Sequence, residues 1–236
     1  MSKRKPQIIT FGVVSDTHLC GEAQRLDALS DFYEWVSGYT NKVYHAGDVT
    51  DGIGVYRGQD QHLLVHGADN QVEYTVKNYP LVKGLETRVI AGNHDLRIFE
   101  RAGTDVVGQI CRRRKDMTYL GRYKGVVNYP FGPMWVVHPA GGGAYSISYG
   151  AQKYVRGLHR KPRIIIFGHR HQKAQFKVEG VECFEAGCFQ DENDFTIRRG
   201  LIPALGGWLI DIKYNYGKIK EITAIFKEYP LKKNFK

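Results

Sequence analysis

Five short apolar runs in this chain are each followed at once by side chains that can bind a metal ion. The runs cover residues 8–14, 42–45, 87–91, 134–137 and 163–167. Short apolar runs that end in polar loops predict buried β-strands. The polar groups that follow them are Asp16-x-His18, Gly47-Asp48-x-x-Asp51, Gly92-Asn93-His94-Asp95, His138 and Gly168-His169-x-His171. Because side chains at strand ends converge in the crevice at the carboxyl edge of a sheet, this pattern predicts both a sheet and a site.

The rest of the chain predicts helices between the first strands and hairpins towards the C-terminus. Apolar residues recur at helical spacing at Leu26, Leu29, Phe32, Tyr33 and Val36. Further helices are expected over 59–78 and 149–159. Further strands are expected over 174–178, 181–185, 208–214 and 219–226. The pattern favours an α/β fold, a two-sheet β-sandwich flanked by helices, in a single domain over residues 1–236.

Taken singly, each polar group has an ordinary structural explanation. An isolated Asp-x-His or Gly-Asp is a common loop or turn, and Gly-Asn-His-Asp is suited to capping a helix. A lone histidine such as His138 is more often a satisfied core or surface residue than a ligand. All five groups occur in order, each after a predicted strand. That joint occurrence favours metal binding.

Together the five groups resemble the motifs of the calcineurin-like metallophosphoesterase superfamily, which run D-x-H, G-D-x-x-D, G-N-H-D/E, H and G-H-x-H. The resemblance implies that superfamily's fold and two metal ions. One ion would be held by Asp16, His18, Asp48 and His171. The second would be held by Asp48, Asn93, His138 and His169, with Asp48 bridging the two. His94 would lie above the phosphate as the catalytic acid, and Asp95 would orient it.

One position departs from the superfamily pattern. The superfamily usually follows the histidine of the lone-H motif with glycine, whereas this chain reads His138-Pro139. His45 and His66 are rival ligands, but neither occupies the matching position. His138 therefore remains the predicted ligand.

These ligand types suit a hydrolytic centre. Two ions roughly 3.5–4 Å apart can clamp a phosphoryl group and activate a bridging hydroxide for in-line attack on phosphorus. His94 would then protonate the leaving alkoxide or stabilise charge on the phosphoryl oxygens. Mixed nitrogen and oxygen ligands suit Mn²⁺, Fe or Zn²⁺. Resemblance to nucleases of the superfamily favours Mn²⁺, with Fe, Zn²⁺, Ni²⁺ and Mg²⁺ as alternatives.

A narrower resemblance lies in residues 47–59, which read GDVTDGIGVYRGQ. The segment is similar to GD-x-x-DGIGVYPGQ in the small, exonuclease subunit of archaeal family-D DNA polymerase, with Arg57 in place of proline. That subunit is longer and carries an OB-type domain for which this chain has no room, so we expect a stand-alone phosphoesterase domain. The resemblance implies a 3′ to 5′ exonuclease-like phosphodiesterase acting on DNA. Tyr56 and Arg57, which follow the metal-binding loop directly, are the predicted substrate-binding residues.

The charge balance agrees with a nucleic-acid substrate without requiring one. The chain has 34 Lys and Arg against 24 Asp and Glu, a net charge of +10, which favours polyanionic partners. Basic clusters at 112–115, 156–163 and 198–199 could contact phosphates, and Tyr56, Tyr145, Tyr149 and Phe189 could stack on bases. Most of these residues are explained equally well as solvated surface or core. A phosphodiesterase or phosphomonoesterase for small or cyclic nucleotides is the main alternative, and a non-catalytic scaffold is disfavoured because every ligand position is filled.

The remaining features point to an intracellular chain. Cys20, Cys111, Cys183 and Cys188 form no short metal-ligand pair, so reduced and mostly buried thiols are expected. No apolar run approaches the roughly 20 residues that span a bilayer, and residues 8–14 read as a strand rather than a signal peptide. We therefore expect a cytoplasmic protein without a membrane partner, with disorder confined to residues 1–7 and 232–236. The sequence does not indicate an oligomeric state.

Overall fold

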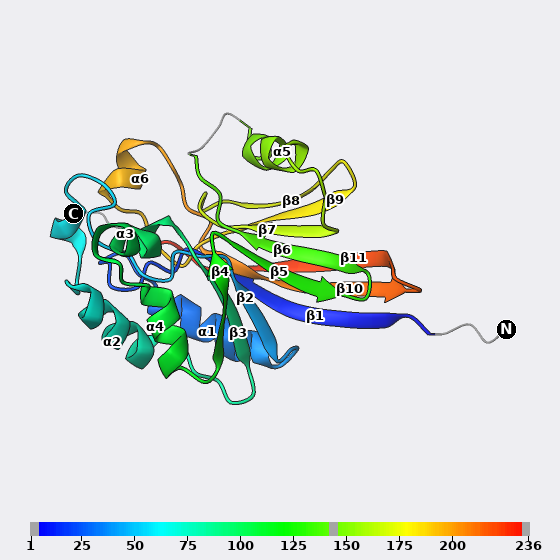
Figure 1. Cartoon of the computed structure of the whole chain (residues 1–236), viewed down its shortest axis with the longest axis horizontal. Coiled ribbons are helices and arrows are strands. Elements are labelled where there is room, and N and C mark those ends of the chain that lie inside the picture. Colours follow the sequence, from blue (N-terminus) through cyan, green and yellow to red (C-terminus); the bar gives the residue numbers. More distant parts are fainter. Residues whose placement is uncertain (1–4, 142–145, 233–236) are drawn as a thin grey trace.

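The computed structural model describes residues 5–141 and 146–232. Two β-sheets lie face to face and helices cover their outer faces (Figure 1). The predicted two-sheet α/β sandwich is confirmed. Of the ends expected to be disordered, residues 1–4 and 233–236 lie outside the described residues, whereas Gln7 begins the first strand.

The first sheet has six strands in the order β11-β10-β1-β2-β3-β4. Its strands are β1 Gln7–Val14, β2 Lys42–His45, β3 Glu86–Ala91, β4 Met117–Arg122, β10 Gly206–Asn215 and β11 Lys218–Glu228. Strands β1 to β4 are parallel, whereas β10 is antiparallel to both of its neighbours. Parallel neighbours need crossover connections, and the helices of this half of the chain provide them.

The second sheet has five strands in the order β5-β6-β7-β9-β8. Its strands are β5 Lys124–Tyr129, β6 Gly132–Val137, β7 Ile164–Phe167, β8 Lys173–Val178 and β9 Val181–Ala186. The central strands β6, β7 and β9 are parallel, and β5 and β8 are antiparallel edge strands.

The space between the sheets is filled by large apolar side chains from both. Phe11 and Tyr44 of the first sheet, Ile166 and Phe184 of the second, and Trp208 of β10 belong to one buried cluster. The ring centroids of Phe184 and Trp208 lie 5.8 Å apart. Full burial of a large apolar side chain contributes about 1.5–3 kcal/mol, so this layer holds the two sheets together.

Helices pack against the outer faces of both sheets. The helices of the described residues are α1 Leu26–Ser37, α2 Ala68–Asn78, α3 Asn93–Ala102, α4 Val106–Arg113, α5 Tyr149–Arg156 and α6 Asp194–Arg198, with a short 3₁₀ turn at Gln59–His62. Helices α1 to α4 share a buried cluster with the first sheet, and α5 packs on the second (Figure 1). Among the described residues, no helix is long and apolar enough to span a membrane.

The helix predicted over 59–78 is wrong in its first half. The 3₁₀ turn ends at His62, and α2 begins only at Ala68, after Gly67 with φ of 87°. Gly58, just before the turn, also has a left-handed φ, of 88°. Glycine adopts this conformation without steric cost, so the two glycines bracket a loop instead of continuing a helix. The sequence also gave no prediction of β4, β5, α3, α4 or α6.

The ends of the parallel strands of both sheets meet at one edge of the sandwich. His138, just after β6 in the second sheet, places Nδ1 2.7 Å from the backbone oxygen of Ala46, just after β2 in the first. The amide of Gly168 donates to the carbonyl of Val137, and that of Asp16 donates to the carbonyl of Gly47. The loops that carry the predicted ligands are therefore tied to one another by backbone hydrogen bonds.

Candidate metal centre and catalytic site

Five of the seven predicted metal ligands have a left-handed backbone. The φ angles are 50° at Asp16, 43° at His18, 54° at Asp48, 81° at His169 and 53° at His171. Non-glycine residues rarely adopt this region, and each one costs on the order of 1–3 kcal/mol when strained. Such strain gathers where function fixes the direction of a side chain. Here it turns five ligands inward at the strand ends.

The first group of ligand atoms comes from Asp16, His18 and His171, which the structure brings within 4.8 Å of one another. Nε2 of His171 lies 3.3 Å from Oδ1 of Asp16, and Nε2 of His18 lies 3.9 Å from the same oxygen. The Nε2 atoms of the two histidines face each other at 3.1 Å. Asp16 and His18 are buried, while His171 is partly open to solvent.

The second group comes from Asp48, His138 and His169. Nε2 of His138 lies 3.1 Å from Oδ2 of Asp48 and 3.0 Å from Oδ1 of Asn93. Oδ2 of Asp48 also lies 4.0 Å from Nε2 of His18, so this one carboxylate stands between the two groups. All seven predicted ligands thus meet at one place. The rivals do not join them, because His45 is buried against Thr17 and Gly47, and His66 is exposed.

The electrostatics of both groups fit cations. Burial alone would raise the pKa of Asp16, but His171 and His138 lower it below its usual value. The pKa of Asp48 is likewise lowered, against burial, chiefly by His138 and His94. Two ionised carboxylates that are buried among imidazoles require positive charge. The donor set of carboxylate oxygens, imidazole nitrogens and one amide oxygen therefore fits divalent ions.

Asp51 contacts the two histidines of the site that face each other in a T-shaped arrangement. Its Oδ1 lies 3.1 Å from Nδ1 of His18 and 3.2 Å from Nδ1 of His94. A metal-binding histidine commonly donates a hydrogen bond from its second ring N–H to a carboxylate, which fixes the tautomer and the ring orientation. Asp51 is placed to accept this hydrogen bond from His18, and it contacts the His94 ring as well.

His94 lies beside the ligands with its ring accessible. Its side chain is 15% exposed, and its backbone amide donates to Oδ1 of Asp48 at 2.8 Å. Burial lowers the pKa of His94, but the carboxylates of Asp48 and Asp51 outweigh burial and raise it to about 9. A protonated imidazole at this position can donate to a bound phosphate ester.

The orienting contact predicted for Asp95 is made by Asp51 instead. The buried carboxylate of Asp95 accepts hydrogen bonds from the amides of Val49, Thr50 and Gly92 at 3.1, 2.8 and 3.0 Å. Asp95 therefore fastens the Asp48 loop to the start of α3, and it acts on His94 only through the backbone. Asp51 is the last residue of the motif Gly47-Asp48-x-x-Asp51, but spacing in the sequence does not reveal that its carboxylate, and not that of Asp95, contacts the His94 ring.

A cavity of about 380 Å³ opens over the two groups of ligands. Its lining includes His94, Tyr56 and Arg199, whereas Arg57 is exposed and lies outside the set of described residues that line it. The predicted substrate-binding pair is therefore divided: Tyr56 faces the cavity and Arg57 does not contribute to its wall.

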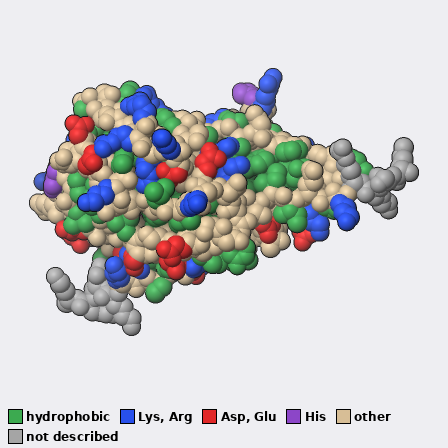
Figure 2. Space-filling view, turned by 90° about the horizontal axis from the view of Figure 1, so that it is seen from below, with side chains coloured by type: hydrophobic (Ala, Val, Ile, Leu, Met, Phe, Trp, Pro, Cys, Tyr) green, Lys and Arg blue, Asp and Glu red, His purple; other side chains and the backbone are tan. Residues whose placement is uncertain are grey.

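Several other residues that were expected to contact nucleic acid are buried in the core or lie outside the described residues. Phe189 is fully buried in the core, so it is not available for stacking, and Tyr145 lies outside the described residues. Arg114 is buried, donating to the carbonyls of Val76, Tyr79 and Pro80 and pairing with Asp116, so it is structural. On the face seen from the side of α1 and α2, Lys and Arg are interspersed with Asp and Glu (Figure 2). That face carries no continuous basic surface.

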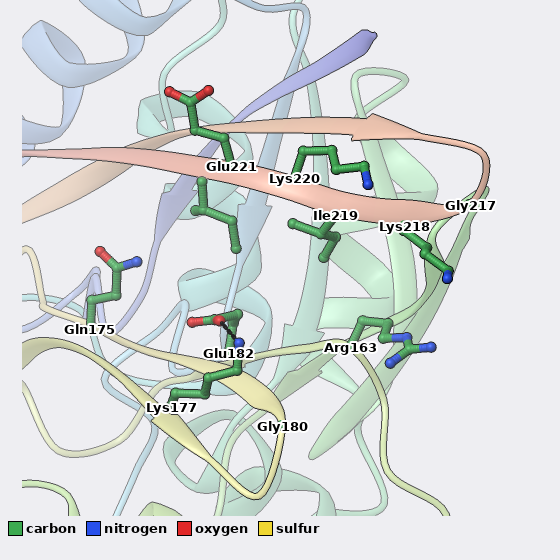
Figure 3. A pocket seen from close by; sticks show the side chains of 11 residues that line it. Arg163, Gln175, Lys177, Gly180, Glu182, Gly217, Lys218, Ile219, Lys220 and Glu221 are labelled. Atoms are coloured by element: carbon green, nitrogen blue, oxygen red, sulfur yellow. Dashed lines mark ion pairs between the residues drawn. The ribbon is translucent and has the colours of Figure 1, made fainter.

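A roomier groove of about 540 Å³ lies at the opposite end of the sandwich, between the β8–β9 and β10–β11 hairpins (Figure 3). Lys177 and Glu182 form an ion pair within it, beside Arg163 and Lys218. No histidine or cysteine is among the described residues that line this groove. The smaller cavity, which is lined by proposed metal ligands, is therefore the candidate active site.

Comparison with known proteins identifies the class. The model of the calcineurin-like phosphoesterase superfamily domain matches residues 9–196. The chain belongs to this superfamily and is a metal-dependent phosphoesterase. The predicted family and enzyme class are therefore confirmed.

Among curated proteins, the chain is similar to the DNA polymerase II small subunit of Methanothermobacter thermautotrophicus, with 26% identity over 252 residues. That match covers 86% of this chain and 52% of the relative. The same subunit of Halobacterium salinarum is 32% identical over 92 residues, covering 37% of this chain and 18% of the relative. The chain thus spans about half the length of the first relative and less of the second.

Among solved structures, a hypothetical protein from Pyrococcus horikoshii has a TM-score of 0.51 and 11% identity, covering 94% of this chain and 88% of that one. A structure described as a novel archaeal phosphodiesterase has a TM-score of 0.47 and 16% identity, covering 93% of this chain and all of that one. At these identities the likeness concerns the fold alone.

Proposed function

We propose that this chain is a phosphodiesterase that uses two divalent metal ions. The position of Asp48 supports this proposal most directly, because its carboxylate lies within 4.0 Å of histidines from both groups of ligands. Asp16, His18, Asp48 and His171 would hold one ion. Asp48, Asn93, His138 and His169 would hold the other. Such ions, when bound, neutralise the phosphoryl oxygens and lower the pKa of water.

The chain's own residues supply positioning and a proton. Asp51 would hold the His18 ring for ligation and the His94 ring for catalysis, since one of its oxygens lies within 3.2 Å of both. His94 would act as the general acid, donating a proton from its exposed ring edge to the leaving oxygen. Asp95 would keep the Asp48 loop and the start of α3 in register through its three backbone hydrogen bonds.

For the metal we propose Mn²⁺. The donor set combines imidazole nitrogens with carboxylate and amide oxygens and contains no thiolate among the proposed ligands. Thiolates favour zinc and iron–sulfur sites, whereas mixed nitrogen and oxygen ligands accept Mn²⁺, Fe, Ni²⁺ or Zn²⁺. Metal analysis of the purified protein, followed by reconstitution of activity with each ion, tests this choice.

For the substrate we propose DNA, cleaved from a 3′ end. The similarity to DNA polymerase II small subunits, the GDVTDGIGVYRGQ segment and the net charge of +10 all support it. The size of the cavity, about 380 Å³, favours a second candidate, a phosphodiesterase for small nucleotides. A pocket of that volume encloses a ligand of small-molecule size.

The experiment is a substrate panel with Mn²⁺. It contains 3′- and 5′-labelled single-stranded and duplex DNA, cyclic nucleotides, and p-nitrophenyl phosphate mono- and diesters. Stepwise shortening of 5′-labelled DNA supports the exonuclease. Turnover of small esters with intact DNA would replace it by the small-nucleotide enzyme, and hydrolysis of monoesters alone would contradict a phosphodiesterase.

A further inference from the structure

Exposed apolar side chains gather on one wall of the catalytic cavity. Ile202 is 77% exposed and Leu201 is 39% exposed, and both line the cavity beside Pro203. Large exposed apolar residues that are grouped beside a reactive centre are unusual on a soluble surface and mark a place where a ligand binds. The ligand that they contact must itself offer an apolar or aromatic surface.

An aromatic side chain also lines the cavity, from a loop that is hydrogen-bonded to the backbone of Asp51. Tyr56 lines the cavity from the glycine-rich loop. In that loop, the Gln59 side chain accepts from the amide of Val55 at 2.7 Å and donates to the carbonyl of Asp51 at 2.5 Å. Burial raises the pKa of Tyr56 to about 12, so its phenol is neutral at physiological pH. The loop that carries this neutral aromatic ring is thereby tied to the backbone of Asp51.

The apolar wall is tied to the metal ligands in the same way. The amide of Leu201 donates to the carbonyl of Thr196 at 2.9 Å, which closes the turn after α6. The amide of Ala204 donates to the carbonyl of His171 at 2.7 Å. The backbone on either side of Ile202 is therefore tied to α6 and to the proposed metal ligand His171.

Side chains with amide groups also line the cavity. Gln172, Gln190 and Asn193 all face the cavity. The Asn193 side-chain oxygen already accepts from the Thr196 amide, but a purely apolar ligand such as an acyl chain would desolvate the amides of Gln172 and Gln190 at a cost. The edge of a heterocyclic base can hydrogen-bond with them. A flat aromatic ring with polar edges fits a cavity that is lined by an aromatic ring, apolar side chains and amides.

Resting on the phosphodiesterase function proposed above, we propose that Tyr56, Leu201 and Ile202 form a pocket for one unpaired nucleobase next to the scissile phosphate. The base contacts the Tyr56 ring and the Ile202 side chain while its phosphate lies over the ligand cluster. A base in such a pocket is out of the double-helical stack, so the enzyme takes a frayed or single-stranded terminal nucleotide. Tyr56, Leu201 and Ile202 thereby set specificity for nucleosides over other alcohols.

The test compares two phosphodiesters that share a leaving group. Thymidine 5′-(p-nitrophenyl phosphate) carries a base, and methyl p-nitrophenyl phosphate has a methyl group in place of the nucleoside. The ratio of their kcat/KM values measures recognition of the nucleoside. Wild type is expected to prefer the thymidine ester at least tenfold. Ile202→Ala and Leu201→Ala are each expected to reduce that ratio about fivefold, and Tyr56→Ala by more, since stacking on an aromatic side chain contributes about 1–3 kcal/mol per base.

Ile225→Ala is the matched control, because Ile225 is 53% exposed on β11 and is not among the described residues that line the catalytic cavity. It should leave the ratio unchanged. A ratio near one in wild type, or an unchanged ratio in all three pocket variants, would overturn the base pocket while leaving the phosphodiesterase intact. Failure of wild type to hydrolyse either ester would overturn both proposals. Circular dichroism of each variant excludes loss of folding as the cause.

Discussion

Oδ1 of Asp51 lies 3.2 Å from Nδ1 of His94. The same oxygen lies 3.1 Å from Nδ1 of His18, and His94 Nδ1 also lies 2.7 Å from the backbone oxygen of Asp51. A proposed metal ligand and the proposed acid are thus oriented by one residue. Because the pKa of Asp51 is lowered by both histidines in spite of burial, its carboxylate stays ionised and can keep both rings in place.

Replacing this carboxylate by an amide should impair catalysis more than it impairs folding. Asp51→Asn keeps the shape but removes the charge, and loss of a supporting carboxylate typically costs 10- to 100-fold in activity or metal affinity. We expect kcat to fall within that range and the pH profile to shift towards acid, since His94 loses a partner that raises its pKa. Asp60→Asn, on the exposed 3₁₀ turn, is the control. An unchanged pH profile would contradict the orienting role.

His94→Ala should abolish most turnover and leave the bound metal nearly unchanged. General acid catalysis contributes about 10²- to 10⁴-fold, and His94 is not among the proposed ligands. Steady-state kinetics and metal content on the same sample measure both effects. His66→Ala, at an exposed histidine, is the control. The loss should be smaller for a substrate whose leaving group needs no proton, such as p-nitrophenolate, and an equal loss for all leaving groups would show that His94 is not the acid.

Asp48→Asn should weaken both metal sites together. Its carboxylate lies 3.1 Å from His138 and 4.0 Å from His18, so it belongs to both groups of ligands. Metal content should fall from two ions to below one per chain, as measured by mass spectrometry after gel filtration. Asp16→Asn, whose carboxylate belongs to the first group, should reduce only one site. Loss of a single ion in both variants would exclude a bridging role for Asp48.

Chelation should lower the melting temperature reversibly. An ion at 100 times its dissociation constant stabilises the folded state by about 2.7 kcal/mol, and for a chain of 150–250 residues each kcal/mol shifts the transition by roughly 2–4 °C. We therefore expect a decrease of about 5–10 °C with EDTA, restored by Mn²⁺. Differential scanning calorimetry measures it, and Asp48→Asn should respond much less. An equal response in that variant would place the stabilising ion elsewhere.

The cysteines should resist alkylation in the native protein. Cys20, Cys183 and Cys188 are buried, and burial raises the pKa values of Cys20, Cys111 and Cys183 to about 12. The thiolate is the reactive form, so at pH 8 little of it is present at these positions. Iodoacetamide followed by mass spectrometry should label the native chain slowly and the urea-unfolded chain at all four cysteines. Rapid native labelling of Cys20 or Cys183 would contradict this packing.

The sequence anticipated the sandwich and the meeting of ligands because both follow from strand-end chemistry. Each ligand stands directly after a short apolar run, and parallel strands bring their carboxyl ends to one edge. The direction in which each side chain points was less predictable. Asp95 adjoins His94 in sequence and Asp51 lies 43 residues before it, yet the structure shows that Asp51 contacts the ring while Asp95 fastens the backbone.

The elements missed from the sequence depend on tertiary contacts. Helix α3 begins with Asn93-His94-Asp95, which reads as a polar loop, yet Leu96 and Ile98 bury its far side. Ile202 was not singled out because an exposed apolar residue on a loop has no periodic pattern; its meaning comes from its place on the cavity wall. Phe189 and Arg114 show the converse, since residues that looked suited to nucleic acid serve the core.

The left-handed backbone at five of the proposed ligands must be stabilised by interactions elsewhere in the fold. The Asp16 amide donates to the carbonyl of Gly47, and the amides of Thr50 and Gly92 donate to Asp95, so backbone hydrogen bonds stabilise the loops of Asp16 and Asp48. The free-energy cost of this backbone strain is therefore offset by the folding of the chain. The directions of the five side chains that are proposed to hold the ions are therefore set by the folded backbone.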